Sequence, residues 1–389
     1  VWSNTGFFCT RGVYRKGSLW QYRRCMSSLS TFDAAQERAF RRRAFPSATA
    51  ADWADWRWQL RHRIRSARGL ERVLELSADE RRALAAPDAW RMPLAVTPYM
   101  LGLLSQEAPG GPLRRTLLPD VREARTGKGE QRDPLGEEAH QVAPGLVRSY
   151  PHKALLLATA DCACFCRYCT RARTAPAPLG GRPGAPPPDS GRALAWLRRH
   201  PEVRDVLVSG GDPLVMSDAR LERLLRALRA IPHVELIRIG TKTPAVLPQR
   251  ITPALARLLR SVRPLWLSLH FTHPSELTPR AAEACGRLLD AGLPLMNQTV
   301  LLRGINDDVE TMRRLNEGLL HLGVKPYYLH QGDLAAGTGH LRSTVARGRA
   351  ILRALCGQVS GYAIPHFMFD PPGGGGKRHL FPGGGRGGD

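Results

Sequence analysis

The segment ALLLATADCACFCRYC, residues 154–169, joins a predicted strand to a cluster of four cysteines. Its leucine-rich first part has the length and apolarity of a parallel strand that is buried on both faces. Three of the cysteines have the spacing CxxxCxxC, namely Cys162, Cys166 and Cys169. A compact loop with this spacing can place three thiolates on three irons of a [4Fe–4S] cube and leave the fourth iron open for another ligand. We therefore expect an iron–sulfur loop directly after a parallel strand.

A structural zinc site is the alternative interpretation of these thiols. Such a site uses four ligands, which usually come from two separated CxxC knuckles. Here Cys164 and the three spaced cysteines all lie within residues 162–169. We favour the iron–sulfur site and interpret Cys164 as a structural or incidental thiol.

Short apolar strands alternate with amphipathic helices through the rest of the chain. The predicted strands span residues 154–159, 205–208, 235–239, 265–269, 293–302 and 325–329. The predicted helices span residues 192–199, 219–230, 253–261, 280–291, 309–322 and 344–355. This alternation is typical of parallel βα units. Six repeats predict an α/β fold, a partial (β/α)6 TIM-like barrel, in which chemistry takes place at the carboxyl ends of the strands.

Polar or glycine-rich residues stand at the carboxyl ends of the predicted strands. Because these ends meet at one rim of a barrel, we expect the side chains there to surround one site. In chain order these residues include Ser209, Gly210, Gly211, Asp212, Lys242, His270, His273, Gln298 and Asp333.

The barrel is predicted to span residues 146–356, after two N-terminal regions. Residues 1–50 are expected to be a poorly ordered or mis-annotated extension, with the true start near Met26. An organellar transit segment is the alternative, because residues 1–30 contain five basic residues and no acidic one.

A helical region is predicted for residues 51–145. Residues 51–86 have a helical pattern in which Trp53 and Trp56 are core residues and Asp52 caps the start.

Composition excludes several classes of protein. No apolar run reaches the roughly 18 residues that a membrane helix needs. The formal charge of +23 is compatible with nucleic-acid binding, but only six of the 57 basic residues are lysines and the arginines are spread along the chain. No basic stripe interleaved with aromatic residues is present, so we do not expect a nucleic-acid partner. Eight cysteines are too few for a disulfide scaffold, which favours a reducing cytoplasm.

Residues 357–389 are predicted to be a C-terminal lysine segment with a glycine-rich, apparently truncated tail. Within it, the sequence DPPGGGGK, residues 370–377, places four glycines directly before Lys377. A flexible tail would have a similar composition, but the preceding residues 364–369 are apolar and predicted to be buried. A glycine-rich backbone can wrap a phosphate, so Lys377 is a candidate for a Schiff base with pyridoxal phosphate.

These motifs together identify a family. The CxxxCxxC loop after the first strand and the Gly-Gly-Asp turn after the second resemble the radical S-adenosylmethionine (SAM) enzymes. With Gly376-Lys377, residues 51–58 (ADWADWRW), residues 250–253 (RITP) and residues 302–306 (LRGIN), the chain resembles the lysine 2,3-aminomutase family, whose members also use pyridoxal phosphate.

The resemblance implies three cofactors and the residues that bind them. A [4Fe–4S] cluster would be held by Cys162, Cys166 and Cys169. SAM would be bound by Ser209, Gly210, Gly211, Asp212, His270 and Gln298. Lys377 would hold pyridoxal phosphate as a Schiff base, and Tyr150 and Lys153 would contact its phosphate.

The resemblance also implies a substrate and a reaction. Arg171 would bind the carboxylate of lysine, and Asp333 and Asp370 would bind its ε-ammonium group. The enzyme would interconvert L-α-lysine and L-β-lysine through a 5′-deoxyadenosyl radical, with pyridoxal phosphate as the radical relay. We expect a reductant such as flavodoxin or ferredoxin, a homo-oligomer (dimer or tetramer) and a cytoplasmic location.

Some positions depart from the family pattern. Tyr168 stands where histidine is common, and Ser149 and Lys153 stand where arginines are common. Asp308 stands where some relatives have a zinc-binding cysteine, so no structural zinc is expected.

The sequence is also compatible with other functions. Within the family, the alternatives are a lysine mutase that serves elongation factor P and an aminomutase for another amino acid. A glutamate-specific enzyme is expected to lack the two acids, because they would repel a third carboxylate. Outside the family, the remote alternative is a basic zinc protein that binds nucleic acid.

Overall fold

The computed structural model describes residues 32–87, 90–175, 190–371 and 376–380. Its centre is one ten-stranded sheet in which the strands follow the order of the sequence. The middle six strands are parallel: β3 (Lys153–Thr159), β4 (Asp205–Gly210), β5 (Leu236–Thr241), β6 (Leu265–Leu269), β7 (Leu295–Leu301) and β8 (Lys325–Gln331). The predicted partial barrel is therefore confirmed, and the ends of its six strands differ from the predicted ends by at most two residues.

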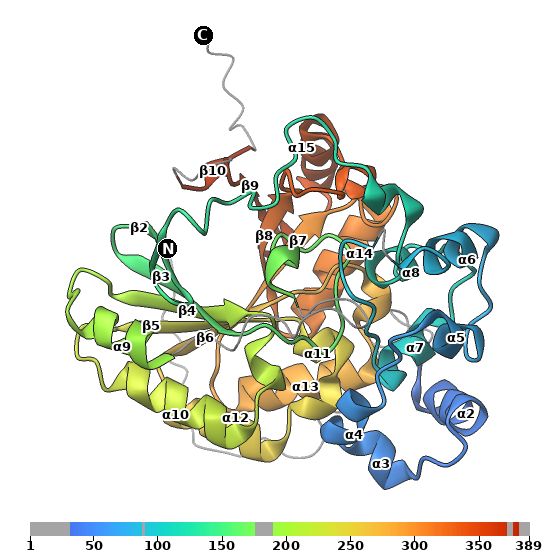
Figure 1. Ribbon diagram of the computed structural model, residues 1–389, viewed down its shortest axis with the longest axis horizontal. Coiled ribbons are helices and arrows are strands. Elements are labelled where there is room, and N and C mark those ends of the chain that lie inside the picture. Colours follow the sequence, from blue (N-terminus) through green and yellow to red (C-terminus); the bar gives the residue numbers. More distant parts are fainter. Residues whose placement is uncertain (1–31, 88–89, 176–189, 372–375, 381–389) are drawn as a thin grey trace, which may run out of the picture.

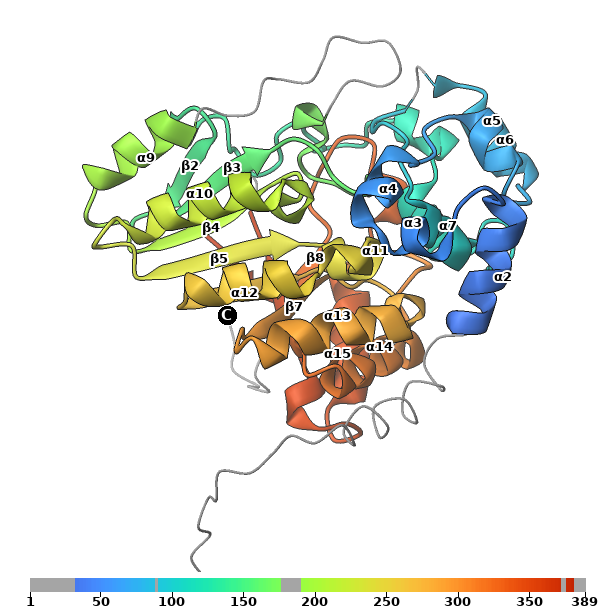
Figure 2. The same cartoon turned by 90° about the horizontal axis from the view of Figure 1, so that it is seen from below.

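Six helices cover the outer face of this curved sheet (Figures 1 and 2). They are α9 (Ser190–Arg198), α10 (Asp218–Arg229), α12 (Pro253–Ser261), α13 (Pro279–Asp290), α14 (Val309–His321) and α15 (Val345–Leu355). All six were predicted. Asp308 is the N-cap of α14, because its carboxylate accepts a hydrogen bond from the backbone of Thr311 at 2.8 Å.

Four edge strands were not predicted. β1 (Gln141–Ala143) and β2 (Leu146–Tyr150) extend the sheet antiparallel to β3. At the other edge, β9 (His366–Phe369) lies parallel to β8, and β10 (Arg378–His379) pairs antiparallel with β9. These strands are short and partly polar, so they lack the apolar run that identifies a buried strand. The pair β9 and β10 places the C-terminal lysine segment beside the barrel.

The N-terminal region consists of short helices at one end of the barrel (Figure 2). They are α2 (Ala34–Ala44), α3 (Ala50–Ala54), α4 (Trp56–Arg61), α5 (Ala67–Glu71), α6 (Ala78–Leu84) and α7 (Pro98–Leu104). The helical pattern predicted for residues 51–86 is therefore interrupted. Asp55 ends α3 and caps α4, while Ser66 and Ser77 cap the next two helices, because these side chains accept hydrogen bonds from backbone N–H groups.

Two other details of the N-terminal region differ from the prediction. Thr49, not Asp52, is the N-cap of α3, and the Asp52 carboxylate accepts a hydrogen bond from the Thr49 backbone at 2.9 Å. Residues 32–50 of the predicted extension belong to the fold, since Phe32 and Phe40 are both only 3% exposed. Residues 1–31 lie outside the described residues.

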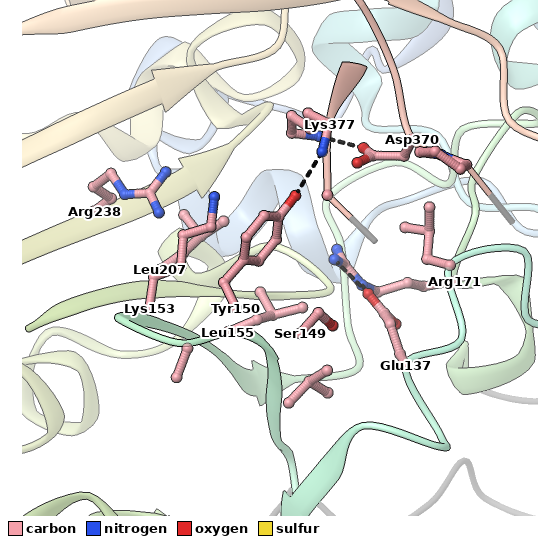
Figure 3. Close-up of a pocket in the computed structure, with 15 residues that line it drawn as sticks. Glu137, Ser149, Tyr150, Lys153, Leu155, Arg171, Leu207, Arg238, Asp370 and Lys377 are labelled. Atoms are coloured by element: carbon pink, nitrogen blue, oxygen red, sulfur yellow. Dashed lines mark hydrogen bonds and ion pairs between the residues drawn. The ribbon is translucent and has the colours of Figure 1, made fainter. Parts of the chain in front are cut away.

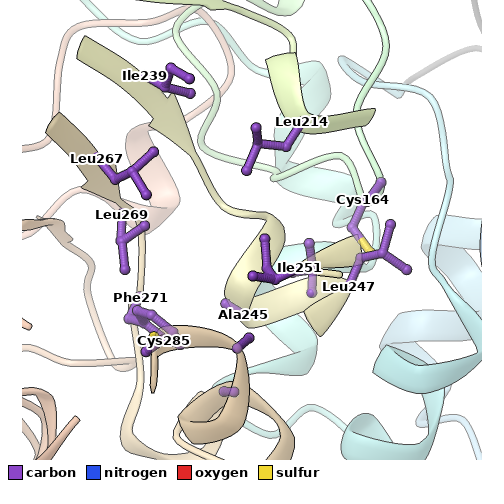
Figure 4. Close-up of a cluster of buried hydrophobic side chains, with 14 of the residues drawn as sticks. Cys164, Leu214, Ile239, Ala245, Leu247, Ile251, Leu267, Leu269, Phe271 and Cys285 are labelled. Atoms are coloured by element: carbon purple, nitrogen blue, oxygen red, sulfur yellow. The ribbon is translucent and has the colours of Figure 1, made fainter. Parts of the chain in front are cut away.

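Two further short helices are α8 (Arg114–Leu117), which precedes β1 in the chain, and α11 (Thr243–Val246), which follows β5. The core runs continuously from the N-terminal helices to the barrel, and Trp53 and Trp56 are buried in it as predicted. Figure 4 shows a part of this core in which Cys164 lies near Leu247. No helix among the described residues is both long and apolar enough to cross a lipid bilayer.

Candidate active site

The cysteine loop begins directly after β3 and separates one thiol from the other three. Cys164 is buried, and its Sγ accepts a hydrogen bond from the Thr97 backbone at 3.4 Å. Cys162, Cys166 and Cys169 are half-buried and close enough to influence one another electrostatically. The three thiols with CxxxCxxC spacing are therefore the accessible ones.

Burial disfavours the thiolate form of these cysteines when no iron is bound. It raises the pKa of Cys166 to about 12 and that of Cys162 well above its ordinary value. Iron offsets such a penalty because it binds the deprotonated sulfur. Within the described part of the chain, no group of three His, Cys, Asp or Glu side chains is arranged so that it could hold one metal ion. A cubane does not need that arrangement, because each thiolate binds a different iron. The donor set fits a three-cysteine cluster.

The glycines after β4 pack against the backbone of the cysteine loop. A Cβ atom on Gly211 would lie 2.2 Å from the carbonyl oxygen of Asp161, and one on Gly210 would lie 2.3 Å from that of Thr159. Gly210 also has a φ of +121°, which side chains other than glycine rarely adopt. Only glycine therefore allows the end of β4 to contact the loop this closely.

Asp212 joins the ends of β4 and β5. Its buried carboxylate accepts hydrogen bonds from the Thr241 hydroxyl at 2.7 Å and from the backbones of Lys242 and Thr243 at 2.8 and 3.0 Å. These donors belong to the protein itself. The structure thus gives Asp212 a role in holding strand ends together.

His270 lies at the end of β6 and contacts Tyr168 of the cysteine loop. The Tyr168 hydroxyl is 2.8 Å from His270 Nε2 and 3.0 Å from the Thr272 hydroxyl. Burial lowers the pKa of His270 to about 3, and the positive charge of Lys242 adds to this effect. The backbone of Gln298 also interacts with the His270 ring. The imidazole is therefore neutral at physiological pH.

A cavity between the β2–β3 edge and the C-terminal segment brings five predicted residues together (Figure 3). They are Tyr150, Lys153, Arg171, Asp370 and Lys377. The amine of Lys377 forms an ion pair with Asp370, and its backbone N–H donates to the Tyr150 hydroxyl at 3.0 Å. The predicted phosphate-wrapping glycines at 373–375 lie outside the described residues.

Two cations lie on one side of this cavity. Lys153 Nζ is 3.5 Å from the centre of the Tyr150 ring, and burial lowers its pKa, with further lowering from Arg238 and Lys377. Arg238, on β5, donates to Asp205 at 2.9 Å and lines the same cavity. Arg238 was not predicted. An arginine within an otherwise apolar strand was the sequence signal that could have identified it.

Arg171 is fixed by a second residue that was not predicted, Glu137. The Glu137 Oε1 atom accepts hydrogen bonds from Nε of Arg171 at 2.8 Å, and its Oε2 atom accepts from Arg173 at 2.9 Å. Burial raises the pKa of Glu137, but the two arginines outweigh that effect, so its pKa is below the ordinary value. Arg171 NH1 lies 3.4 Å from the Ser209 hydroxyl. Arg171 thus connects the cavity to the end of β4.

Asp333 and His330 extend the site along β8. Burial raises the pKa of Asp333 to about 7, the charge of Asp370 raises it further, and Lys377 and Arg171 partly oppose the shift. Burial also lowers the pKa of His330 well below its ordinary value, as do Lys377 and His270. His330, which lies two residues after Tyr328 in β8, was not predicted. These interactions place two acids and an unprotonated imidazole near Lys377.

Comparison with known proteins agrees with this architecture. Residues 156–315 match the Radical SAM superfamily. The match covers the cysteine loop and most of the parallel strands. Membership implies a [4Fe–4S] cluster and SAM as cofactors.

Curated relatives define the family more closely. The chain is 45% identical over 344 residues to L-lysine 2,3-aminomutase of Fusobacterium nucleatum, covering 88% of this chain and 80% of that protein. It is 44% identical over 340 residues to the enzyme of the same name from Clostridium subterminale, covering 87% and 80%. Glutamate 2,3-aminomutase of Clostridioides difficile is 38% identical over 346 residues, with coverage of 86% and 78%. The chain therefore belongs to the lysine 2,3-aminomutase family of radical SAM isomerases.

Proposed function

We propose that this chain interconverts L-α-lysine and L-β-lysine with a [4Fe–4S] cluster, SAM and pyridoxal phosphate. The relatives include enzymes named for lysine and for glutamate, so membership of the family does not decide the substrate. The observation that supports lysine is the charge distribution around Lys377. Asp370 forms an ion pair with this amine and lines the same cavity as Arg171. Asp333 is close enough to Asp370, Lys377 and Arg171 for their charges to shift its pKa.

Lysine carries charges that match this arrangement. Its carboxylate would be bound by the Nη1 side of Arg171, which makes only a 3.4 Å contact with the Ser209 hydroxyl, while Glu137 occupies the Nε and Nη2 side. Its ε-ammonium group would be bound by Asp333 and Asp370. Glutamate would instead place a second carboxylate against these acids, which costs electrostatic energy in a partly buried site.

Lys377 would hold pyridoxal phosphate, and nearby cations would bind its phosphate group. Tyr150, Lys153, Arg238 and Ser149 all line the cavity that contains Lys377. Lys153 forms no ion pair within the described residues, so its charge is available to an anion. When bound, the cofactor supplies a conjugated ring that can carry an unpaired electron while an amino group changes position.

Cys162, Cys166 and Cys169 would hold the cluster, which together with SAM would supply a carbon-centred radical. Ser209, His270, Gln298 and the backbone of Gly210 and Gly211 would surround SAM. We do not retain the Asp212 side chain as a SAM ligand, because protein donors occupy its carboxylate. The protein itself orients the bound molecules and excludes water from the barrel interior.

Cellular context follows from the same chemistry. Reduction of the cluster needs a low-potential donor such as flavodoxin or ferredoxin. We further propose a cytoplasmic homo-oligomer, a dimer or tetramer, without a nucleic-acid or membrane partner.

A substrate panel tests the proposal. The reconstituted protein would be incubated under anaerobic conditions with SAM, pyridoxal phosphate, a reductant and either L-lysine or L-glutamate. We expect a 3-amino product from lysine and at least about a hundredfold less from glutamate. Equal or preferential conversion of glutamate would contradict the charge argument. The Asp333→Asn protein serves as the matched control, because its discrimination against glutamate should decrease.

A further inference from the structure

The N-terminal region holds the cysteine loop through direct backbone contacts. The backbone N–H of Phe165 donates to the carbonyl of Ala95 at 3.3 Å, and that of Arg167 donates to Thr116 at 2.8 Å. Neither the strands nor the outer helices of the barrel supply these contacts. The loop that would carry the cluster is therefore positioned by residues that precede the barrel as well as by the strand ends of the barrel.

Three arginine side chains reinforce this attachment, and two of them are neutralised. The Arg167 guanidinium is fully buried, forms an ion pair with Glu123 and donates to the carbonyl of Met92 at 2.8 Å. The Arg63 guanidinium forms an ion pair with Asp161 at 3.0 Å and donates to the carbonyl of Cys162. Each of these two cations thus has a carboxylate partner.

Arg91 differs because its charge has no such partner. Its guanidinium donates to the carbonyl of Cys169 and, at 3.4 Å, to that of Arg167. No carboxylate within the described residues forms an ion pair with Arg91. Glu123 accepts a hydrogen bond from the Arg91 backbone at 3.3 Å, but its charge is already balanced by Arg167.

We propose that Arg91 is a positioning residue that raises the reduction potential of the cluster. This inference rests on the proposed iron–sulfur role of the three cysteines. Reduction adds one electron to a cluster that already carries three thiolates, so a fixed cation beside Cys169 stabilises the reduced state more than the oxidised state. The result is easier electron transfer to the cluster before any chemistry on SAM.

The potential of the reconstituted full-length protein tests this role directly. Loaded Arg91→Gln and Arg91→Lys proteins would be titrated with a reductant while the spectrum of the cluster is recorded. We expect Arg91→Gln to lower the equilibrium constant for one-electron reduction by about tenfold, which is about 59 mV. Arg91→Lys should remain within about threefold of the wild type, because it keeps the charge.

A neutral control separates charge from packing. The double variant Arg63→Gln with Asp161→Asn removes a charge-balanced pair beside Cys162, so its potential should stay close to that of the wild type. Iron content would be measured in parallel, since a purely structural role would lower iron content without shifting the potential of loaded molecules.

Two results would overturn the inference. The first is an unchanged potential in loaded Arg91→Gln. The second is a decrease of about tenfold in the equilibrium constant of Arg91→Lys relative to the wild type, which would show that the charge is not what matters. This second result can be measured even if Arg91→Gln does not retain iron. A wild-type protein that binds no cluster would instead contradict the proposed function itself.

Discussion

Lys377 and Asp370 form an ion pair in the cavity, so the amine proposed to hold pyridoxal phosphate also neutralises an acid proposed to bind substrate. If Lys377 carried the cofactor as proposed, Asp370 would lose this partner. The carboxylate would then be available to the ammonium group of lysine. The proposed cofactor and substrate sites would therefore be linked through one contact.

Replacing Lys377 by alanine should abolish attachment of pyridoxal phosphate. In the wild-type protein, borohydride reduction followed by peptide mapping should place a pyridoxyl label on the peptide that contains Lys377. The Lys377→Ala protein should carry no label and have no aminomutase activity. Lys325→Ala is the matched control, since the Lys325 amine donates to the Tyr362 backbone far from the cavity. A label retained in Lys377→Ala would refute the assignment.

Removing the charge of Asp333 should weaken the binding of lysine. It should also make the KM for lysine less dependent on pH. With a pKa of about 7, Asp333 loses its negative charge as the pH falls, so the KM of the wild type for lysine should increase about tenfold from about pH 8 to about pH 6. Asp333→Asn should have a high KM that varies little with pH over this range. Steady-state kinetics check this, with Asp333→Glu expected to retain a pH-dependent KM.

The same pKa predicts the sign of a stability effect. The folded-state pKa of about 7 is above the ordinary 3.8, so Asp333 favours folding most below about pH 4 and progressively less up to about pH 7. Asparagine does not titrate. The Tm of Asp333→Asn minus that of the wild type should therefore increase between about pH 5 and pH 8 in the protein without cofactors. A difference that decreases over this interval would show that the shift has the opposite sign.

Glu137 should be necessary for both stability and substrate binding. Glu137→Gln leaves Arg171 and Arg173 without their shared buried carboxylate, which should reduce the free energy of unfolding by about 3–5 kcal/mol. It should also raise the KM for lysine, because Arg171 is no longer held in place. Chemical denaturation and kinetics measure the two effects.

Glu138→Gln is the control for Glu137. Glu138 also pairs with Arg173, but its side chain is 70% exposed. The variant should change stability by less than about 1 kcal/mol. Equal effects at the two positions would contradict the importance assigned to burial.

Gly211 should be essential for the cysteine loop. A Cβ atom there would lie 2.2 Å from the Asp161 carbonyl, so Gly211→Ala must displace the backbone and should reduce both stability and bound iron. Gly286→Ala is the matched control, because no atom lies within 4 Å of the added Cβ and the residue is in helix α13. Iron content and Tm should be maintained in this control, and a similar loss in both variants would contradict the packing explanation.

The sequence alone was sufficient to predict the barrel and the position of the cysteine loop directly after its first strand. Apolar strands buried on both faces and strongly amphipathic helices have clear periods, so residues such as those of β3 could be assigned without tertiary information. The edge strands could not, because β10 contains only two residues and pairs with β9 from elsewhere in the chain. The capping residues of the N-terminal helices were missed for a similar reason, since polar side chains such as Asp55 divide an otherwise continuous helical pattern.

The supporting residues of the site were the least predictable. Lys377 was predicted from the glycines before it, and Arg171 and Asp370 were predicted from a family resemblance, but Glu137 lies in a loop whose sequence has no distinctive pattern. Its role depends on a contact with a residue 34 positions away in the chain. The glycines at 210 and 211 were predicted from their motif, but the atoms that require them, the carbonyls of Thr159 and Asp161, became apparent only in the structure.

The most direct test follows the nitrogen atom. L-[2-15N]lysine would be incubated under anaerobic conditions with the reconstituted protein, SAM, pyridoxal phosphate and a reductant, and the product would be examined by NMR. The proposed function predicts β-lysine in which the label is on the nitrogen bonded to C3. The absence of this product from a protein that carries both the cluster and pyridoxal phosphate would contradict it.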